Sequence, residues 1–264
     1  MTAIGTNPAA LNATFFVNQA DAGLTKSIKR LSSGSKIADP SDDAAGVAVS
    51  GKLMSAVKRL LAVSDCAQNV ISFSQVADGF LSVLSDELTR MSELAIRGTN
   101  GAFSASDRAN YALEFENLSS AITAQVTNAR FNGAPLFQTG SIGATTTVAI
   151  NGDGTNVYNS VLEDIRDMGA SAGTTGMLNQ LNFAQIDTTT SASAAISIIS
   201  SAIERVASAR AAVNADVSVM NFYIQAINVE RINTDTANSR IKDLDYASES
   251  TTLAKHNILL QAGT

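Results

Sequence analysis

The sequence predicts a mainly α-helical protein: an elongated, antiparallel coiled-coil rod of two long helices and a shorter one, a small β-hairpin region, and amphipathic terminal helices. Two long apolar stripes, in residues 49–95 and 193–239, and a Gly-, Thr- and Ser-rich segment between them lead to this class. Apolar residues at alternating steps of four and three lie on one face of an α-helix. A stripe kept up over so many turns is a coiled-coil seam, which other helices must cover.

Composition and charge exclude several classes of function. The 264 residues carry a net charge of −6, with a pI of about 4.8, which argues against a nucleic-acid partner. The single Cys66 excludes an internal disulfide framework and a Cys-based metal site. No apolar run approaches the ~18 residues of a membrane-spanning helix. We therefore expect no membrane insertion, no cofactor and no metal.

The N-terminal segment, residues 6–33, carries a weak helical pattern that ends in Leu24, Ile28 and Leu31. A short isolated helix is marginal in water, so we expect this segment to become ordered against a partner. Residues 1–17 lack a basic stretch before their apolar residues, which is not typical of a cleaved signal peptide. If the protein is exported, another route takes it.

The first long helix is predicted to begin at the Asp-Pro-Ser-Asp-Asp stretch. Asp39 suits the N-cap and Pro40 the first helical position, while Asp42 and Asp43 complement the positive end of the helix dipole. Ser74 is the one polar member of the stripe that follows. The main seam residues are Leu53, Leu60, Val63, Val70, Leu81, Leu84, Leu88 and Met91.

A second, shorter helix is expected after the Gly-rich break at residues 97–101. Ser104 or Ser106 can cap it, and the short connection favours an antiparallel return along the first helix. The Asn132-Gly133 pair between apolar residues predicts a tight turn. A strand is expected at 145–150, a turn at 151–154 and a short helix at 161–168.

The last long helix is expected over residues 193–239. Its stripe includes Ile196, Ile199 and Ile203, and its phase slips by about one residue near Ala209. The tail, residues 241–264, contains Leu253 and Leu260 but has too short an apolar face to be stable alone. The predicted domains are terminal assembly segments at 1–38 and 241–264, a helical rod at 39–137 and 193–240, and a variable central region at 138–192.

Chemical motifs give little support for catalysis. His256 is the only histidine, so a His-based triad or metal pair has no second member. Asp42 and Asp43 are adjacent and point about 100° apart on a helix, so they do not share a ligand. The 151–156 stretch resembles a calcium loop but lacks its glycine and its bidentate carboxylate, so a turn is the better interpretation. The functional feature that the sequence does support is the pair of amphipathic terminal segments, which are predicted to act in assembly between subunits.

Several short motifs occur in a fixed order near the two ends of the chain. They are Arg30–Ile37, Asp42–Gly46, Phe131–Gly133, Leu136-Phe137, Ala237–Ile241, Asp243, Asp245–Ala247, Glu249 and Gln261–Thr264. Together they resemble the N- and C-terminal signatures of bacterial flagellin, and the resemblance covers residues 1–137 and 193–264. The family normally continues beyond this last stretch with a further apolar helix.

The resemblance implies a secreted structural subunit that polymerises into the extracellular flagellar filament. The implied partners are copies of the chain, the flagellar export apparatus, a secretion chaperone, and the filament cap and junction proteins. In the polymer, apolar faces at the ends would lie between neighbouring subunits. The predicted assembly residues are Leu24, Ile28, Leu31, Leu253 and Leu260.

The resemblance also implies a contact with Toll-like receptor 5. Recognised flagellins use an Arg and a Leu on the first long helix and a Glu on the next, and Arg90, Leu94 and Glu114 match these positions. Thr89 and Ser92 stand where recognised members commonly have Gln and Arg.

Three other functions stay open at the level of sequence. A hook–filament junction protein of the same lineage would share the terminal character but act in a few copies. A cytoplasmic coiled-coil scaffold would be absent from sheared extracellular filaments. An enzyme in the central insert is disfavoured, because a zinc peptidase of this kind needs a His-Glu-x-x-His motif that the sequence lacks.

Overall fold

The computed structural model describes residues 7–137, 146–160, 181 and 184–263. The named elements are α1 (Pro8–Ser33), α2 (Ala44–Gly98), α3 (Ala105–Asn128), β1 (Arg130–Phe131), β2 (Ala134–Pro135), β3 (Thr146–Ala149), β4 (Val157–Ser160), α5 (Thr189–Lys242) and α6 (Tyr246–Gly263). The mainly α class with a small antiparallel hairpin is confirmed. The helix predicted at 161–168 lies outside the described residues.

The chain forms two compact units. The first combines Met1–Arg59 with Val229–Thr264, and the second is Leu60–Asn228. Both α2 and α5 contribute one part to each unit. The sequence analysis instead divided the chain by role in assembly, with boundaries near 38 and 241. That division stays a prediction.

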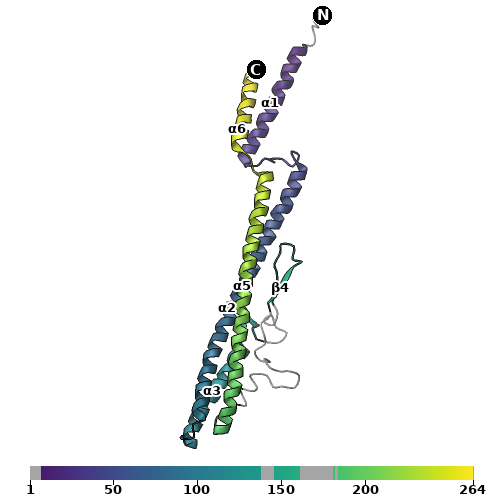
Figure 1. Ribbon diagram of the computed structural model, residues 1–264. Coiled ribbons are helices and arrows are strands. Elements are labelled where there is room, and N and C mark those ends of the chain that lie inside the picture. The colour runs from purple at the N-terminus through teal and green to yellow at the C-terminus, as the bar shows by residue number, and fades with distance from the viewer. Residues whose placement is uncertain (1–6, 138–145, 161–180, 182–183, 264) are drawn as a thin grey trace. The chain divides into compact units, whose positions relative to one another are not determined.

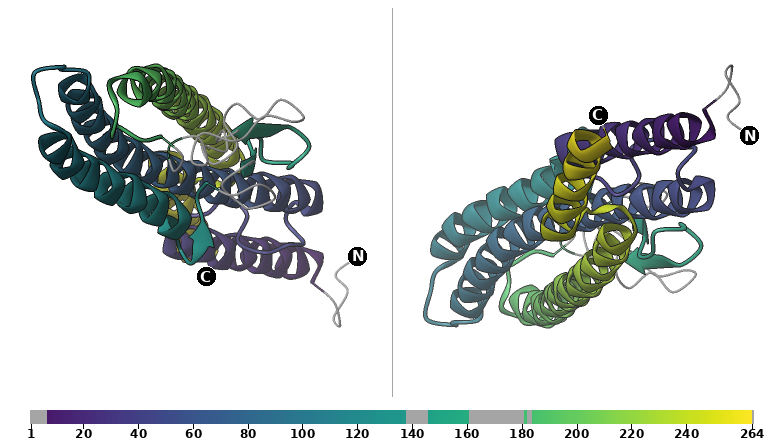
Figure 2. Two further views of the ribbon diagram at one scale, coloured as in Figure 1. Left: turned by 90° about the horizontal axis from the view of Figure 1, so that it is seen from below. Right: turned by 90° about the horizontal axis from the view of Figure 1, so that it is seen from above.

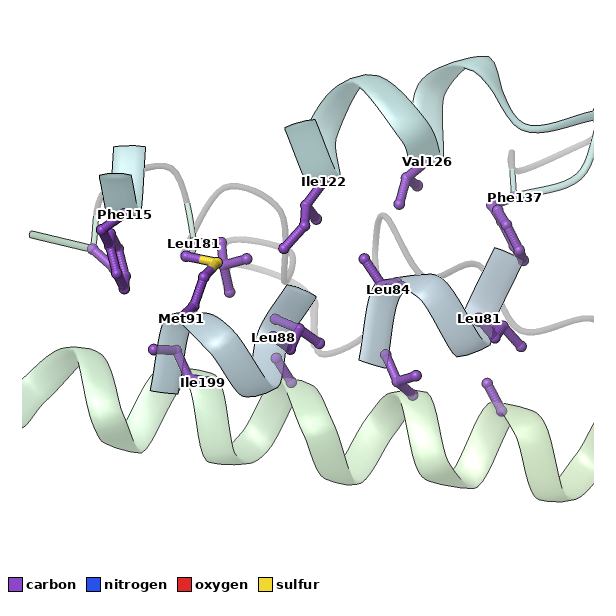
Figure 3. Close-up of a cluster of buried hydrophobic side chains, with 14 of the residues drawn as sticks. Leu81, Leu84, Leu88, Met91, Phe115, Ile122, Val126, Phe137, Leu181 and Ile199 are labelled. Atoms are coloured by element: carbon purple, nitrogen blue, oxygen red, sulfur yellow. The ribbon is translucent and has the colours of Figure 1, made fainter. Parts of the chain in front are cut away.

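The second unit is built on three helices packed lengthwise. The α3 helix lies alongside α2 in both views of Figure 2. The α2 and α5 helices run antiparallel, because Gly98 approaches Ala192 at one end while Asp78 pairs with Arg210 farther along. Figure 3 shows the resulting core, in which α2 presents its apolar face toward both neighbours. The buried side chains drawn there include Leu81, Leu84, Leu88, Met91, Phe115, Ile122, Val126, Phe137, Leu181 and Ile199.

The contact between α2 and α5 follows an unbroken heptad pattern. On α5, the buried residues Ile199, Val206, Val213 and Met220 recur every seven positions, and a second series of small residues lies between them. That second series is Ala195, Ala202 and Ala209. The predicted phase slip near Ala209 is therefore wrong. The large residues Ile196 and Ile203 are only half-buried, because the alanines occupy the positions that face the partner helix.

The start of α2 differs from the prediction. The helix begins at Ala44, and the carboxylate of Asp43 caps it by accepting a 2.8 Å hydrogen bond from the Gly46 N–H. The Asp39 carbonyl instead accepts from the Asp42 N–H at 2.9 Å, which closes a turn before the helix. The assignment of Asp39 as the N-cap and of Pro40 as the first helical residue was therefore wrong.

Two local signals in the second unit are confirmed. Ser104 caps α3 in a capping box, in which its hydroxyl accepts from the Asp107 N–H and the Asp107 carboxylate accepts from the Ser104 N–H. Asn132 and Gly133 both adopt positive φ, 49° and 81°, and connect β1 to β2. Positive φ at both central residues is the requirement of the tight hairpin turn that an Asn-Gly pair satisfies.

The β3–β4 hairpin packs on α2 and α5 within the second unit. Val148 is buried with Ala67, Val70 and Met220, and the ring of Tyr158 packs against the same group. In the connecting turn the Asn156 N–H donates to the Asn151 side chain at 3.2 Å. The 151–156 stretch is thus a turn that closes a hairpin, as the sequence indicated.

The first unit contains the pair α1·α6, which lie side by side in Figure 1. The two helices run antiparallel, since Gly23 contacts His256 and Gly34 contacts Tyr246. Next to this pair, the segment that follows α1 is hydrogen-bonded through its backbone to the segment that precedes α6. The Lys36 N–H donates to the Lys242 carbonyl at 2.7 Å, and the Leu244 N–H donates to the Gly34 carbonyl at 3.2 Å.

Candidate functional site

The helix α1 has an apolar face that α6 does not cover. Within the helix, Ala20 and Ser27 are the buried residues, and they lie toward α6. Leu11 and Phe15, one turn apart on another face, are 63% and 64% exposed. Exposed aromatic and aliphatic side chains gathered on one helix mark an interaction surface. We call Leu11 and Phe15 the outer face of α1; Ile28 is 52% exposed but lies on a different side of the helix.

The predicted assembly residues divide into two groups. Ile28 is exposed, while the others are half-buried against the helix pair: Leu24, Leu31, Leu253 and Leu260. Ile258 and Leu259 on α6 are exposed by 64% and 47%, although the sequence analysis did not select them as assembly residues. These two residues can be identified as exposed only when the side of α6 that packs on α1 is known. The apolar residues of a short helix do not show by themselves which side that is.

A cavity of about 360 Å³ opens between α1 and α6. Phe16 and Val17 line it from α1, and His256 and Leu259 line it from α6. The His256 imidazole packs directly on Gly23, and its Nδ1 atom is buried without a hydrogen-bond partner in the described part of the chain. This histidine therefore serves in packing, and among the described residues no hydrogen-bond partner reaches Nδ1 to activate it.

The predicted seam residues lie along α2 on its covered side. Leu60, Val70 and Leu81 are buried, and so are Leu84, Leu88 and Met91. Leu53 and Val63 are half-buried. An open groove of about 420 Å³ adjoins the seam, lined by Val76, Gly79, Phe80, Val83 and Gln125.

The predicted receptor-contact residues are brought close together, but they differ in exposure. Arg90 donates to the Glu114 carboxylate through Nε at 2.9 Å and Nη2 at 2.8 Å, and through Nη1 to Glu93 at 2.9 Å. These contacts raise the pKa of Arg90 further above its usual range, with Glu114 the main cause. Leu94 is fully buried in the core of the second unit, so its side chain does not lie on the surface with Arg90 and Glu114.

Other kinds of site were searched for in the described residues. Within 7–137, 146–160, 181 and 184–263, no three His, Cys, Asp or Glu side chains gather as a metal site would require. In the same ranges, no helix combines the length and the hydropathy needed to cross a bilayer. Cys66 is a free, exposed thiol on α2.

Comparison with known proteins places these features in a family. The model of the bacterial flagellin N-terminal helical region matches residues 4–141, and that of the bacterial flagellin C-terminal helical region matches residues 196–264. Flagellin FlaB2 of Treponema pallidum is 33% identical over 99% of this chain and 93% of its own length. The flagellar filament 33 kDa core protein of Treponema phagedenis is 32% identical with the same coverage.

Solved structures show the same fold at lower identity. The crystal structure of Bacillus cereus flagellin matches with a TM-score of 0.52 and 18% identity, over 62% of this chain and 88% of that one. A putative flagellar hook-associated protein from Vibrio parahaemolyticus matches with a TM-score of 0.65 and 14% identity, over 76% and 100%. The chain is thus a helical protein with paired N- and C-terminal regions of the flagellar type. It belongs to the bacterial flagellin family.

Proposed function

We propose that this chain is the structural subunit of a bacterial flagellar filament and acts without catalysis. The observation that carries the proposal is the outer face of α1, where Leu11 and Phe15 remain exposed in a helix that already packs on α6. Burying an apolar side chain of this size is worth roughly 1.5–3 kcal/mol. Membership of the flagellin family and the filament core protein among its relatives support the same function.

The polymer forms by contacts between different surfaces of neighbouring copies. In this polymer, the outer face of α1 packs on a different surface of the neighbouring copy, so the contact joins unlike surfaces. A contact of this kind that does not close on itself propagates as a helical filament. The chain therefore acts outside the cell, after export by the flagellar apparatus with its chaperone, and it meets the cap and junction proteins at the filament ends.

A junction protein of the same lineage is the second candidate. Its support is the fold shared with the hook-associated protein, at 14% identity. The filament core protein of Treponema phagedenis is 32% identical over 99% of this chain, and this favours the filament subunit. The copy number per flagellum separates the two, because a junction protein is present in a few copies and a filament subunit forms the bulk of the polymer.

The test of the proposed function is polymerisation of a Phe15→Asp variant, with Phe15→Leu as the matched control. Both variants keep the helix pair, because this side chain is 64% exposed. We expect Phe15→Leu to give filaments in electron micrographs and Phe15→Asp to remain monomeric with an unchanged circular dichroism spectrum. Filaments of normal length from Phe15→Asp would contradict the role of the outer face.

The chain is also proposed to contact Toll-like receptor 5 through Arg90 and Glu114. Both side chains are more than 40% exposed, and their mutual hydrogen bonds hold the guanidinium in place. Arg90→Ala should lower receptor activation by monomer in a reporter assay, with Arg59→Ala on the same helix as the control. Equal activation by both variants would contradict the contact. Leu94 is left out of this surface because it is buried.

A further inference from the structure

We infer that Lys26, Arg30, Asp42 and Glu249 form an ionic clasp that seats the terminal helix pair α1·α6 on the segment preceding α2, and that acid releases it. All four residues lie in the first unit. They come from three segments: α1, the turn before α2, and α6. The inference rests on the proposed function only where its test uses assembled protein.

The centre of the clasp is the Asp42 carboxylate. Its Oδ1 atom lies 2.7 Å from the Lys26 ammonium, and its Oδ2 atom lies 3.7 Å from Nη2 of Arg30. The side chain of Asp42 is 15% exposed, so water screens these contacts less than it screens a surface pair. Asp42 was expected to act on the dipole of α2, but its carboxylate instead contacts two cations of α1.

Arg30 extends the clasp to the third segment. Its Nη1 atom lies 3.7 Å from the Glu249 carboxylate on α6, while Nη2 faces Asp42. The Arg30 and Glu249 side chains are 23% and 12% exposed. One guanidinium thus links the turn before α2 to the first part of α6. Losing either carboxylate leaves a poorly hydrated cation without one of its partners, which is costly.

The backbone explains why a clasp acts at this place. The chain leaves and re-enters the terminal pair through two short segments, and these are hydrogen-bonded to each other at Lys36 and Lys242 and at Gly34 and Leu244. Gly34 has φ of 67°, and the Tyr246 hydroxyl lies where a side chain at this position would stand. The four charged side chains therefore brace the point at which the helix pair joins the rest of the unit.

The direction of the pH effect follows from Asp42. The hydrogen bond from Lys26 is the main cause that lowers the pKa of Asp42, and the charge of Arg30 acts in the same direction. A carboxyl whose pKa is lowered by folding contributes stability above its usual range near 3.9, and that stability is lost as the pH falls through the lowered value. The other charged groups near this turn include Glu249, which faces Arg30, and the loose pair of Lys29 and Asp39. The adjacent Asp43 carboxylate accepts from the Gly46 N–H and caps α2.

The same turn provides a matched control. Asp39 lies 4.0 Å from Lys29, and both side chains are more than half exposed. Asp42→Asn and Asp39→Asn remove the same charge from neighbouring positions, but only the first opens the clasp. An exposed pair of this kind contributes little to stability.

The experiment measures amide hydrogen exchange of α1 and α6 in the assembled full chain, at pH 7 and over a series of lower pH values. At pH 7 we expect Asp42→Asn to exchange on the order of ten-fold faster than wild type, and Asp39→Asn to match wild type. As the pH falls through the lowered pKa of Asp42, the exchange of wild type should converge on that of Asp42→Asn, since protonation then opens the clasp. Equal exchange of wild type and Asp42→Asn at pH 7 would overturn the inference.

A conservative variant guards against a variant that fails to assemble. If Asp42→Asn gives no polymer while Asp39→Asn does, Asp42→Glu should still assemble, because it keeps a carboxylate facing both Lys26 and Arg30. If Asp42→Glu restores neither assembly nor slow exchange, the clasp is overturned. If wild type itself forms no polymer, the proposed function fails, and the same exchange comparison on the monomer still decides the clasp.

Discussion

Tyr158 on β4 donates a 2.6 Å hydrogen bond to the carboxylate of Asp216 on α5. Asp216 follows Ala195, Ala202 and Ala209 at the same heptad spacing, so a carboxylate stands where the seam of α5 otherwise carries a small apolar residue. The hydrogen bond to Asp216 is the main cause that raises the pKa of Tyr158 to about 12. The β3–β4 hairpin thus supplies a hydrogen-bond donor to the Asp216 carboxylate, which stands at a seam position of α5.

Removing this hydroxyl should loosen the hairpin. We expect Tyr158→Phe to lower the free energy of unfolding by about 1–3 kcal/mol, because the Asp216 carboxylate loses a short hydrogen bond. A tyrosine whose pKa rises on folding contributes stability that is present below about pH 10 and is lost as the pH rises toward 12. Urea denaturation at pH 8 and pH 11 checks both statements. The control is Tyr223→Phe, which removes the hydroxyl of the ring that packs against Tyr158. This variant should keep the stability of wild type at both pH values.

The close approach of Gly23 to His256 leaves no room for a side chain. A methyl group built on Gly23 would overlap the imidazole ring, whereas one built on Gly51 meets no atom of the described residues within 4 Å. Gly51→Ala should therefore stabilise its helix by about 0.5–1 kcal/mol through propensity alone. Gly23→Ala should instead separate α1 from α6, measured as faster hydrogen exchange in both helices. Unchanged exchange in Gly23→Ala would contradict this packing.

The seam of the second unit should behave as a close-packed core. Leu88 is fully buried between α2 and its neighbours, so Leu88→Ala should cost about 2–5 kcal/mol in urea denaturation. Leu61 on the same helix is 44% exposed, and Leu61→Ala should cost less than about 1 kcal/mol. A similar loss in both variants would mean that this face of α2 is not the seam.

Ser74 is a polar residue inside the seam. It is 1% exposed, and its hydroxyl has no hydrogen-bond partner in the part of the chain that the structure describes. Ser74→Ala removes a buried unsatisfied group, so we expect a gain of about 1 kcal/mol in the free energy of unfolding. Ser72→Ala, where the exposed hydroxyl donates to the Gln68 carbonyl, should change stability little. A loss of stability in Ser74→Ala would show that its hydroxyl is satisfied.

Local signals in the sequence predicted much of this fold. The stripe of α2 needs only the helical period, the capping box needs Ser104 and Asp107 three residues apart, and the tight turn needs an Asn-Gly pair. Each signal lies within one element, so its physical cause is visible in a short window. For the same reason, the flagellin motifs near both ends identified the family that the comparisons show.

The features that sequence reasoning missed depend on distant parts of the chain. Asp42 was assigned to a helix dipole because its partners Lys26 and Glu249 are visible only when three segments are folded together. Leu94 matches a surface position of a family, but here it packs into the core. The alanines of α5 were overlooked because small residues carry little weight in an apolar stripe, although their size allows two helices to approach closely.

Cys66 gives this molecule a practical property. Its thiol is exposed on α2, and the sequence contains one cysteine. A maleimide dye would therefore attach once per subunit, and every copy in a polymer would carry its fluorophore at the same residue. Brightness along a single filament would then count subunits directly, and growth of a flagellum could be followed in two colours on living cells.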